Sequence, residues 1–250
     1  MKRALLGTYA YAEFGACVGV WLPILAASRI AHRNDAVPRI PGRWLRRMAR
    51  AAGRLSPLWK FEVRGTAPPD IATHAYVVVS NHESSADPFL LSWLPWDMRW
   101  VAKQELFRIP FAGWALTLSG DIPLRRGDAA SVRAMLAECK RTLRAGLSVM
   151  MFPEGTRSAD GTLGRFKDGA FDLAIDAGVP VLPVALTGTH ECRPKGSLWF
   201  GEASAVVQVL EPIATQGMTA ADLPRLRDES RERIAAAVGV LRAERAGGQA

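Results

Sequence analysis

Beyond residue 60, the chain alternates short apolar runs with segments whose apolar residues recur at helical spacing. The apolar runs predict strands at 61–64, 75–80, 99–102, 148–152, 181–185 and 205–210. The intervening segments predict helices at 88–94, 111–118, 129–145, 169–177 and 220–245. Strands that alternate with helices favour an α/β domain, 61–250, with a mostly parallel central sheet flanked by helices.

Charge is distributed unevenly between the two parts of the chain. Residues 1–60 hold 11 Lys and Arg against 2 Asp and Glu, whereas residues 61–250 hold 21 against 22. The net charge of +8 therefore comes from the first quarter of the chain. Enzymes that act on nucleic acids more often carry basic residues across their whole body. A basic segment attached to a neutral body instead predicts an anionic surface as partner, and no nucleic acid.

Within the N-terminal segment, residues 4–27 contain one charged side chain, that of Glu13. As a helix this stretch is about 36 Å long at 1.5 Å per residue, which is enough to cross a bilayer. A membrane-embedded or membrane-lying helix is the favoured interpretation, although a carboxylate near its middle is unfavourable in lipid. A cleaved signal peptide and a buried core helix are the alternatives. The sequence leaves open whether the helix crosses the membrane or lies in it.

A second helix is predicted in residues 39–60, where apolar and basic side chains recur at helical spacing on different faces. The apolar set is Trp44, Leu45, Met48, Ala52, Leu55 and Trp59, and the basic set is Arg43, Arg46, Arg47, Arg50 and Arg54. Tryptophans beside an arginine stripe suit the headgroup region of an anionic membrane. The alternative is an amphipathic helix that packs on the body with a solvated basic face, and both descriptions can hold together. Residues 1–60 are expected to form a membrane-associated helical segment at the cell inner membrane, with the active site facing the cytoplasm.

Cysteine and histidine are sparse in this chain. The three cysteines, Cys17, Cys139 and Cys192, are widely spaced, and none belongs to a Cys-x-x-Cys pair. The four histidines contain no His-Glu-x-x-His pattern. We therefore expect neither a disulfide framework nor a metal site.

The first polar cluster runs from Asn81 to Pro88, directly after the strand that ends at Ser80. The carboxyl ends of strands are where α/β folds usually bind ligands. On one continuous helix, His82 and Asp87 would point about 140° away from each other. They meet only if His82 ends the strand segment and Asp87 begins the next helix. The pair Asp87-Pro88 predicts that boundary, with Asp87 as N-cap and Pro88 at the first helical position.

The pair formed by His82 and Asp87 has two interpretations. In the first, Asp87 only caps a helix and His82 is a loop residue. In the second, the carboxylate fixes the imidazole tautomer, and the imidazole takes a proton from a hydroxyl. The chain has no Gly-x-Ser-x-Gly elbow to supply a serine nucleophile. The attacking hydroxyl would therefore belong to a substrate.

Three further blocks are weak signals when taken alone. Residues 120–126 read Gly-x-Ile-x-Leu-x-Arg, and residues 152–158 read Phe-Pro-Glu-Gly-Thr-Arg-Ser after an apolar strand. Glycine lets a backbone approach a ligand, and arginine binds phosphate or carboxylate through two parallel donors. Residues 179–184 contain two prolines in an apolar run, which predicts an irregular or edge strand.

The order of these four blocks is far more specific than any one of them. Asn-His-x4-Asp, Gly-x-Ile-x-Leu-x-Arg, Phe-Pro-Glu-Gly-Thr-Arg-Ser and Val-Pro-Val-x-Pro-Val follow one another along the chain. This succession resembles the glycerophospholipid acyltransferases, and most closely the bacterial 1-acylglycerol-3-phosphate (lysophosphatidic acid) acyltransferases. The likeness includes segments 100–106, 109–113 and 161–169, and it runs from about residue 75 to residue 190.

The resemblance implies transfer of an acyl chain to the free hydroxyl of 1-acylglycerol-3-phosphate, which gives phosphatidic acid. The donor would be a thioester, acyl-CoA or acyl carrier protein (acyl-ACP), used as co-substrate without any cofactor. It further implies that His82, oriented by Asp87, deprotonates the hydroxyl and that no acyl-enzyme forms. An acyltransferase that acts on another lysolipid, a lyso-aminolipid or other lysophospholipid, is the alternative. A non-catalytic protein that binds membranes or nucleic acid leaves the His82–Asp87 pair unexplained.

The same resemblance assigns residues to the lysophospholipid acceptor. The residues that correspond to the family's third motif, which positions the phosphorylated acceptor, are Glu154, Gly155, Thr156 and Arg157. Arg126 corresponds to the phosphate ligand of the second motif, and Lys103 to a further phosphate contact. Residues 180–183 would shape the acyl-binding region. The second motif departs from the family pattern at Pro123 and Arg125, which leaves open whether Arg125 or Arg126 holds phosphate.

Overall fold

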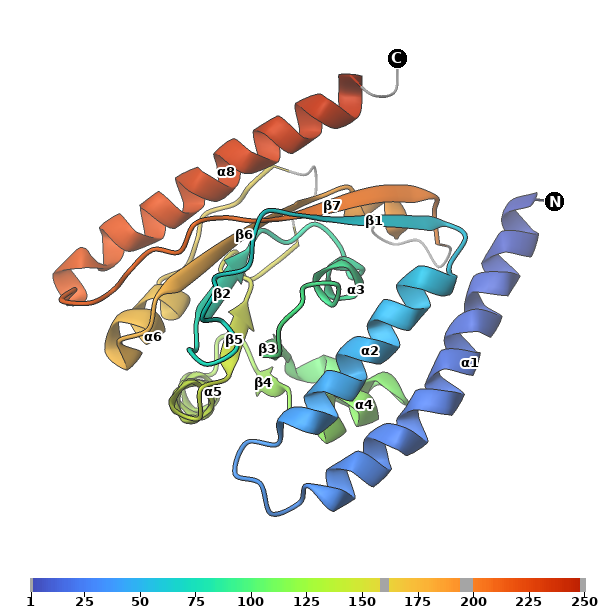
Figure 1. The fold of residues 1–250 in the computed structure, drawn as a ribbon, viewed down its shortest axis with the longest axis horizontal. Coiled ribbons are helices and arrows are strands. Elements are labelled where there is room, and N and C mark those ends of the chain that lie inside the picture. The colour runs from blue at the N-terminus through green and yellow to red at the C-terminus, as the bar shows by residue number, and fades with distance from the viewer. Residues whose placement is uncertain (1, 158–161, 194–199, 248–250) are drawn as a thin grey trace.

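The chain folds around one central sheet with helices on both faces (Figure 1). This computed structural model describes residues 2–157, 162–193 and 200–247. Across those ranges the strand order is β1 (Trp59–Arg64), β7 (Ala203–Val209), β6 (Val181–Thr187), β2 (Val77–Ser80), β5 (Ser148–Met151), β3 (Met98–Lys103) and β4 (Ile122–Leu124). Only β6 and β7 pair in antiparallel fashion among these strands. The predicted α/β class with a mostly parallel sheet is confirmed.

Helices cover the sheet and extend beyond it. They are α1 (Lys2–Ala31), α2 (Arg39–Leu55), α3 (Asp87–Leu91), α4 (Ala112–Ser119), α5 (Ala129–Arg144), α6 (Gly169–Ala177), α7 (Thr189–Cys192) and α8 (Leu223–Gly247). Two short 3-10 turns, η1 (Gln104–Arg108) and η2 (Ala220–Asp222), precede α4 and α8. The five helices predicted beyond residue 60 correspond to α3, α4, α5, α6 and the turn η2 with α8.

Successive residues of the inner strands alternate between two cores. Val77 and Val79 of β2 pack with side chains of α5, α6 and α8 on one face of the sheet. Val78 packs on the other face with Leu90 and Leu91 of α3. Because side chains of a strand point alternately to the two faces, an unbroken apolar run such as that of β2 requires cover on both. This explains why the central strands carry few polar residues before their ends.

The strands β2 to β6 all end at the same side of the sheet, which we call the carboxyl edge; the opposite side is the amino edge. The strands β1 and β7 run the other way, so their first residues lie at the carboxyl edge. The loops after β2, β3, β4, β5 and β6 therefore share one edge. The fold in this way brings together polar motifs that are far apart in the sequence.

Two strands differ from the sequence prediction. The strand β4 was not predicted, because it has three residues and contains Pro123. The strand β6 is central and fully buried, so the prediction of an irregular or edge strand at 179–184 is wrong. Pro183 is tolerated because the ladder with β7 begins at Val184, and the Pro183 carbonyl still accepts a hydrogen bond from Leu210. The missing N–H group thus falls at the end of that ladder.

The N-terminal helices α1 and α2 lie side by side along the body (Figure 1). The segment Gly7–Ala31 of α1 is long and apolar enough to cross a membrane, yet only 17% of its most apolar window is buried, which argues against a core helix. Leu25 of α1 packs with Leu45 of α2 and Ala115 of α4. The helix α2 ends at Leu55, and Trp59 already belongs to β1, so the predicted helical face does not extend through Trp59.

Candidate active site

The polar cluster after β2 brings His82 and Asp87 into contact at the carboxyl edge. His82 Nδ1 lies 2.6 Å from Asp87 Oδ2. The Asp87 side chain is fully buried, whereas that of His82 remains 16% exposed. Because a carboxylate can only accept, Nδ1 carries the proton and Nε2 keeps its lone pair. The two side chains meet as the sequence predicted, and the free ring nitrogen can accept a proton.

Asp87 is held by donors from two segments of the chain, the loop after β2 and the residue Thr189 after β6. It is the first residue of α3, and the N-cap position belongs to Ala86, so the prediction of Asp87 as N-cap is wrong. Its carboxylate instead turns back and accepts hydrogen bonds from the N–H groups of Glu83, at 2.9 Å, and Ser84, at 3.1 Å. The hydroxyl of Thr189, which follows β6, also donates to Asp87 Oδ1. These contacts leave one orientation for the carboxylate that faces His82.

The segment after β5 supports His82 from the other side. The ring of Phe152 stacks on the imidazole, with centroids 4.1 Å apart and planes 19° apart. Glu154 Oε1 accepts the backbone N–H of His82 at 2.8 Å, and Glu154 Oε2 accepts the N–H of Gly164 at 2.8 Å. Burial raises the pKa of Glu154, although the two N–H donors oppose the shift. Both carboxylate oxygens of Glu154 are thus engaged in holding the backbone of the site.

The cationic residues predicted to bind phosphate lie along the carboxyl edge. Arg157 follows β5, Lys103 ends β3, and Arg126 follows β4. Neighbouring strands lie about 4.8 Å apart, so these strands stand roughly 5, 10 and 14 Å from β2 across the sheet. All three side chains are exposed, and Lys103 Nζ lies 3.4 Å from a carboxylate oxygen of Glu105. The carboxyl edge therefore presents positive charge on the side of β2 where β5, β3 and β4 lie.

The two arginines of the second motif differ in their contacts. Arg125 pairs with Asp128 at 3.5 Å, and its backbone N–H donates to Ser131. Arg126 is exposed and makes no hydrogen bond or ion pair with any residue that the structure describes. Arg126 is therefore the guanidinium left for a ligand.

The third motif also contains a close approach that requires glycine. Gly155 has a φ of +70°, and a Cβ at this position would lie 3.0 Å from Lys167 Nζ. Lys167 is exposed, and its backbone N–H donates to the carbonyl of Pro153 at 2.9 Å. Thr156, next in the motif, is exposed at the same edge. Gly155 thus lets an additional ammonium group lie against the loop that holds His82.

An aromatic pocket of about 220 Å³ opens beside the loop between His82 and Asp87. Its lining residues are Tyr11, Phe14, Trp59, Ser85, Ala86, Phe89, Arg193 and Phe200. Phe14 of α1 stacks on Phe200, with ring centroids 5.2 Å apart. The walls come from α1, β1, α3 and the segment before β7. The N-terminal helix in this way forms part of a cavity at the catalytic edge.

Several residues of the site were not found from the sequence. Thr189, Glu83 and Phe152 contact the His82–Asp87 pair. Thr189 begins α7, and the other two lie in loops, so their side-chain directions depend on the tertiary fold. Lys167 carried a weak signal, since it stands in a segment that resembles the family. Residues 180–183, expected to shape an acyl-binding region, lie in and before the buried strand β6, and none of them lines the aromatic pocket.

Most of the basic side chains of α2 contact the body. Arg43 pairs with Asp97 at 2.6 Å, and Arg46 pairs with the buried Asp121 at 2.9 Å. Arg50 donates to the carbonyls of Ser92 and Leu94. These partners stand at the amino edge, opposite His82. The helix packs on the body, as the alternative interpretation expected, but these three arginines bind the body and do not form the solvated basic face that this interpretation described.

Comparisons with known proteins agree with this architecture. A family model described as Acyltransferase matches residues 60–187, which is just over half of the chain. The chain is 38% identical over 188 residues to the chloroplastic 1-acyl-sn-glycerol-3-phosphate acyltransferase BAT2 of Brassica napus, a match that covers 74% of this chain and 53% of that protein. It is 39% identical over 178 residues to 1-acyl-sn-glycerol-3-phosphate acyltransferase alpha of Homo sapiens, which covers 69% of this chain and 61% of that protein.

A solved structure resembles the whole fold. The crystal structure of the 1-acyl-sn-glycerophosphate (LPA) acyltransferase PlsC from Thermotoga maritima superimposes with a TM-score of 0.77 at 25% sequence identity. The match covers 96% of this chain and 98% of that one. By contrast, the chain spans between about half and three fifths of the two curated relatives named above.

Proposed function

The chain belongs to the acyltransferase family, and on that premise we propose that it transfers an acyl chain from a thioester to the free hydroxyl of 1-acylglycerol-3-phosphate. The product is phosphatidic acid. The observation that carries the proposal is the His82–Asp87 pair at the carboxyl edge, beside exposed cationic side chains. The names of the relatives support the same acceptor.

His82 acts as general base in this proposal. Its Nε2 takes the proton of the acceptor hydroxyl while the hydroxyl oxygen attacks the carbonyl carbon of the thioester. The carbon–sulfur bond then breaks, and the imidazolium returns the proton to the departing thiolate of coenzyme A or acyl carrier protein. Asp87, held by backbone donors, stabilises the imidazolium and keeps the ring in the reactive tautomer. General-base catalysis of this kind contributes about 10²–10⁴-fold.

Arg126, Arg157, Lys103 and Lys167 bind the acceptor phosphate in this proposal. Guanidinium groups bind phosphate through two parallel donors, whereas ammonium groups act as point charges. Arg126 is assigned in preference to Arg125, because Arg125 is already paired with Asp128. Glu154 holds the backbone of His82, and Gly155 and Thr156 shape the loop around it. These groups fix the distance between the phosphate and the reacting hydroxyl.

We assign the aromatic pocket to an acyl chain. It is lined mainly by aromatic rings, it opens next to Ser85 and Ala86 of the catalytic loop, and one wall belongs to α1. The same helix exposes the apolar side chains Val20, Ile24 and Ile30, while Tyr9 and Tyr11 are partly exposed and Tyr11 lines the pocket. A substrate that enters from lipid thus meets apolar surface before it reaches His82.

Membrane association follows from the same apolar surface. The helix α1 packs lengthwise on α2 and α4, which favours a helix that lies in the bilayer surface rather than one that crosses it. We place the protein at the inner membrane with the catalytic edge toward the cytoplasm, because a thioester donor is a cytoplasmic molecule. The anionic headgroups there are the partner of those basic residues that do not contact the body.

A panel of acceptors tests the proposal. Purified protein in detergent or vesicles is given one radiolabelled acyl-CoA with lysophosphatidate, with lysophosphatidylethanolamine, and with a lyso-aminolipid. We expect transfer to lysophosphatidate to dominate and to be lost in His82→Ala, while that variant keeps the unfolding temperature of the wild type. Preferred transfer to another acceptor would support the alternative lysolipid specificity, and full turnover by His82→Ala would refute the role of the base.

The phosphate contact is tested separately with Arg157→Ala. We expect the KM for lysophosphatidate to rise by about tenfold, which corresponds to the loss of one charge-assisted contact. The KM for the thioester and the kcat at saturating acceptor should change less. An unchanged KM for the acceptor would exclude Arg157 as a phosphate ligand.

A further inference from the structure

The C-terminal helix α8 contacts three segments that supply contacts to His82 or Asp87, although it lies outside the motifs described above. Three arginines of this helix make the contacts: Arg231, Arg242 and Arg245. They reach the loops that follow β2, β5 and β6 at the carboxyl edge. Each loop also contributes a group that contacts His82 or Asp87 directly.

Arg242 holds the residue next to the histidine. Its Nη2 donates to Glu83 Oε1 at 2.9 Å, and the Glu83 side chain is only 1% exposed. Glu83 Oε2 accepts the backbone N–H of Gly188 at 2.9 Å, and the backbone N–H of Glu83 itself donates to Asp87 Oδ2 at 2.9 Å. A shift of Glu83 would therefore displace His82 along the chain and Asp87 through a hydrogen bond.

Arg231 and Arg245 hold the other two loops. Arg231 donates to the carbonyls of Gly164 and Leu163 at 2.9 and 3.0 Å, and the N–H of Gly164 is the donor that orients Glu154. Arg245 donates to both carboxylate oxygens of Glu191.

Gly188 brings Arg245 close to the loop that carries Thr189. It has a φ of +93°, and a Cβ there would lie 2.5 Å from the Arg245 guanidinium. Only glycine permits this approach, and the next residue, Thr189, donates to Asp87. The loop after β6 is thus packed against α8 at the point where it meets the catalytic carboxylate.

We propose that α8 positions the general base, and that Arg242, acting through Glu83, is the principal positioning residue. The inference rests on the proposed function, because it treats His82 as the group that accepts the proton. The reaction rate depends strongly on the positions of the reacting groups: a misplacement of about 1 Å can lower the rate by about 10²-fold. Without Arg242, the buried Glu83 carboxylate keeps the Gly188 N–H at 2.9 Å and His190 Nδ1 at 3.4 Å but loses its guanidinium partner. It is then expected to move toward water, and Glu83 is joined directly to His82.

The experiment compares Arg242 with a matched arginine on the same helix. Arg233 has a side chain that is 40% exposed and pairs with Glu229, whereas Arg242 is 39% exposed and pairs with Glu83. The variants Arg242→Gln, Arg242→Lys, Arg233→Gln and Glu83→Gln/Arg242→Gln are purified as full chains. For each one, kcat and the KM values for lysophosphatidate and acyl-CoA are measured together with the unfolding temperature. Wild type and His82→Ala are included in every series.

For Arg242→Gln we expect kcat to fall by about tenfold or more, with both KM values nearly unchanged, since positioning acts on the chemical step. Arg242→Lys should recover part of kcat, and Arg233→Gln should equal the wild type. The double variant should exceed Arg242→Gln, because it leaves no buried carboxylate that has lost its guanidinium partner, but it should stay below the wild type. If Arg242→Gln does not fold, the double variant carries the test.

Three results would overturn the inference, and the first two concern kcat. One is a wild-type kcat in the double variant or in Arg242→Gln; the other is an equal loss in Arg233→Gln, which would indicate general destabilisation of α8. Both are distinct from failure of the proposed function, which would appear as an inactive wild type or an active His82→Ala. A KM effect without a kcat effect would likewise contradict positioning.

Discussion

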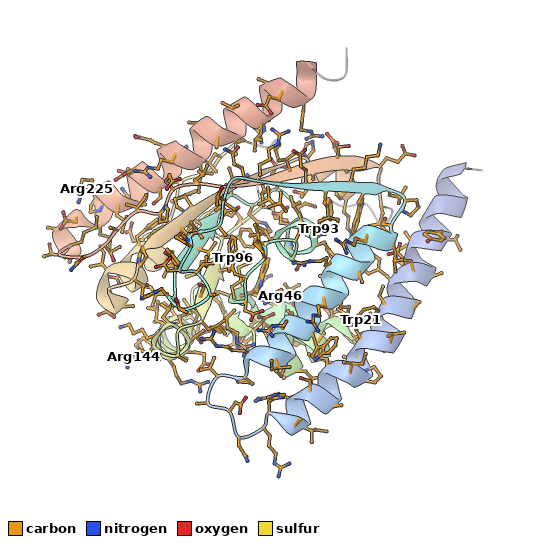
Figure 2. All side chains as sticks on the ribbon, in the orientation of Figure 1. Trp21, Arg46, Trp93, Trp96, Arg144 and Arg225 are labelled. Carbon is orange, nitrogen blue, oxygen red and sulfur yellow. The ribbon has the colours of Figure 1, made fainter. Side chains whose placement is uncertain are left out.

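Helices α2 and α8 are both rich in arginine, and three arginines of each helix bind the body, but at opposite edges of the sheet. Arg46 of α2 pairs with Asp121 before β4, at the amino edge. Arg242 of α8 pairs with Glu83 after β2, at the carboxyl edge. Figure 2 shows Arg46 between α2 and the strands, whereas Arg225 projects from the N-terminal end of α8. The two helices therefore form the same kind of arginine–carboxylate pair, one at the edge opposite His82 and the other at the edge that holds it.

This difference teaches how to interpret a basic helix. A stripe of arginines suggests a membrane or an anionic ligand, yet three of the five stripe arginines of α2 bond to carboxylates and carbonyls of the body. Contacts at the amino edge should affect stability, because no catalytic group lies there. Contacts at the carboxyl edge should affect turnover. The predictions below test this division.

The largest expected effect is at the carboxyl edge. Asp87→Asn removes the anion that accepts from His82 Nδ1 and from the Thr189 hydroxyl. We expect kcat to fall by about 10²–10⁴-fold, since the imidazolium loses its counter-ion and the ring its tautomer. The matched control is Asp121→Asn at the amino edge, another buried aspartate that accepts a backbone N–H. An equal loss of kcat in both variants would contradict the division between edges.

The next effect is on stability at the amino edge. Arg46→Gln leaves Asp121 buried without its ion-pair partner, and the two side chains are only 12% and 1% exposed. Removing one partner of such a pair lowers the free energy of unfolding by about 3 kcal/mol. Thermal or denaturant unfolding should show this loss, while kcat per folded molecule stays at the wild-type value. A lower kcat in the folded fraction would mean that the amino edge also controls the chemistry.

Two arginines of α2 remain available for the membrane. Arg47 and Arg54 are exposed and stack on Trp44 and Trp93, with guanidinium-to-ring distances of 4.7 and 5.3 Å. Each basic residue near an anionic surface contributes about 1 kcal/mol, so the double variant Arg47→Gln/Arg54→Gln should bind phosphatidylglycerol vesicles roughly 30-fold more weakly.

The control for vesicle binding is a double variant on α8. Arg225→Gln/Arg233→Gln changes the net charge by the same amount, and both of its side chains are exposed. Co-sedimentation at low salt measures the binding of both variants to the same vesicles. If the two double variants lose binding equally, net charge alone attracts the protein, and α2 has no special role at the membrane.

The sequence predicted which segments form strands better than it predicted the positions of the strands in the sheet. Six of the seven strands found in residues 2–157, 162–193 and 200–247 were predicted, because apolar runs between helical segments are a strong signal. The strand β4 was missed, because three residues with a proline give no period. The run at 179–184 was expected to be an irregular or edge strand because it contains two prolines, whereas β6 is central and its ladder with β7 begins only at Val184, after Pro183. Local rules of this kind fail where tertiary pairing decides.

The residues of the motifs were predictable from the sequence, but the residues that hold them in position were not. His82 and Asp87 followed from their spacing after a strand and from the order of four motifs. Arg242 carried no signal, because it contacts Glu83 across 159 positions of sequence and belongs to no motif. The partners of the α2 arginines were equally unpredictable, since the sequence shows which face of the helix is basic but not which residues pack against that face.

The helix α1 offers the contrasting case of a buried charge without a partner, and the smallest predicted effect. Glu13 is 8% exposed, and neither carboxylate oxygen has a hydrogen-bond partner among the described residues. Burial raises the pKa of Glu13 from 4.5 to about 6.

Because the folded state holds the Glu13 proton more tightly than the unfolded state, the free energy of unfolding falls as pH rises from about 4.5 to 6 and stays lower above that range. Glu13→Gln should therefore raise the free energy of unfolding by up to about 2 kcal/mol at pH 8 and leave it unchanged at pH 4. Thermal unfolding in detergent at both pH values measures this, and an equal gain at both would show that shape, not charge, governs the site.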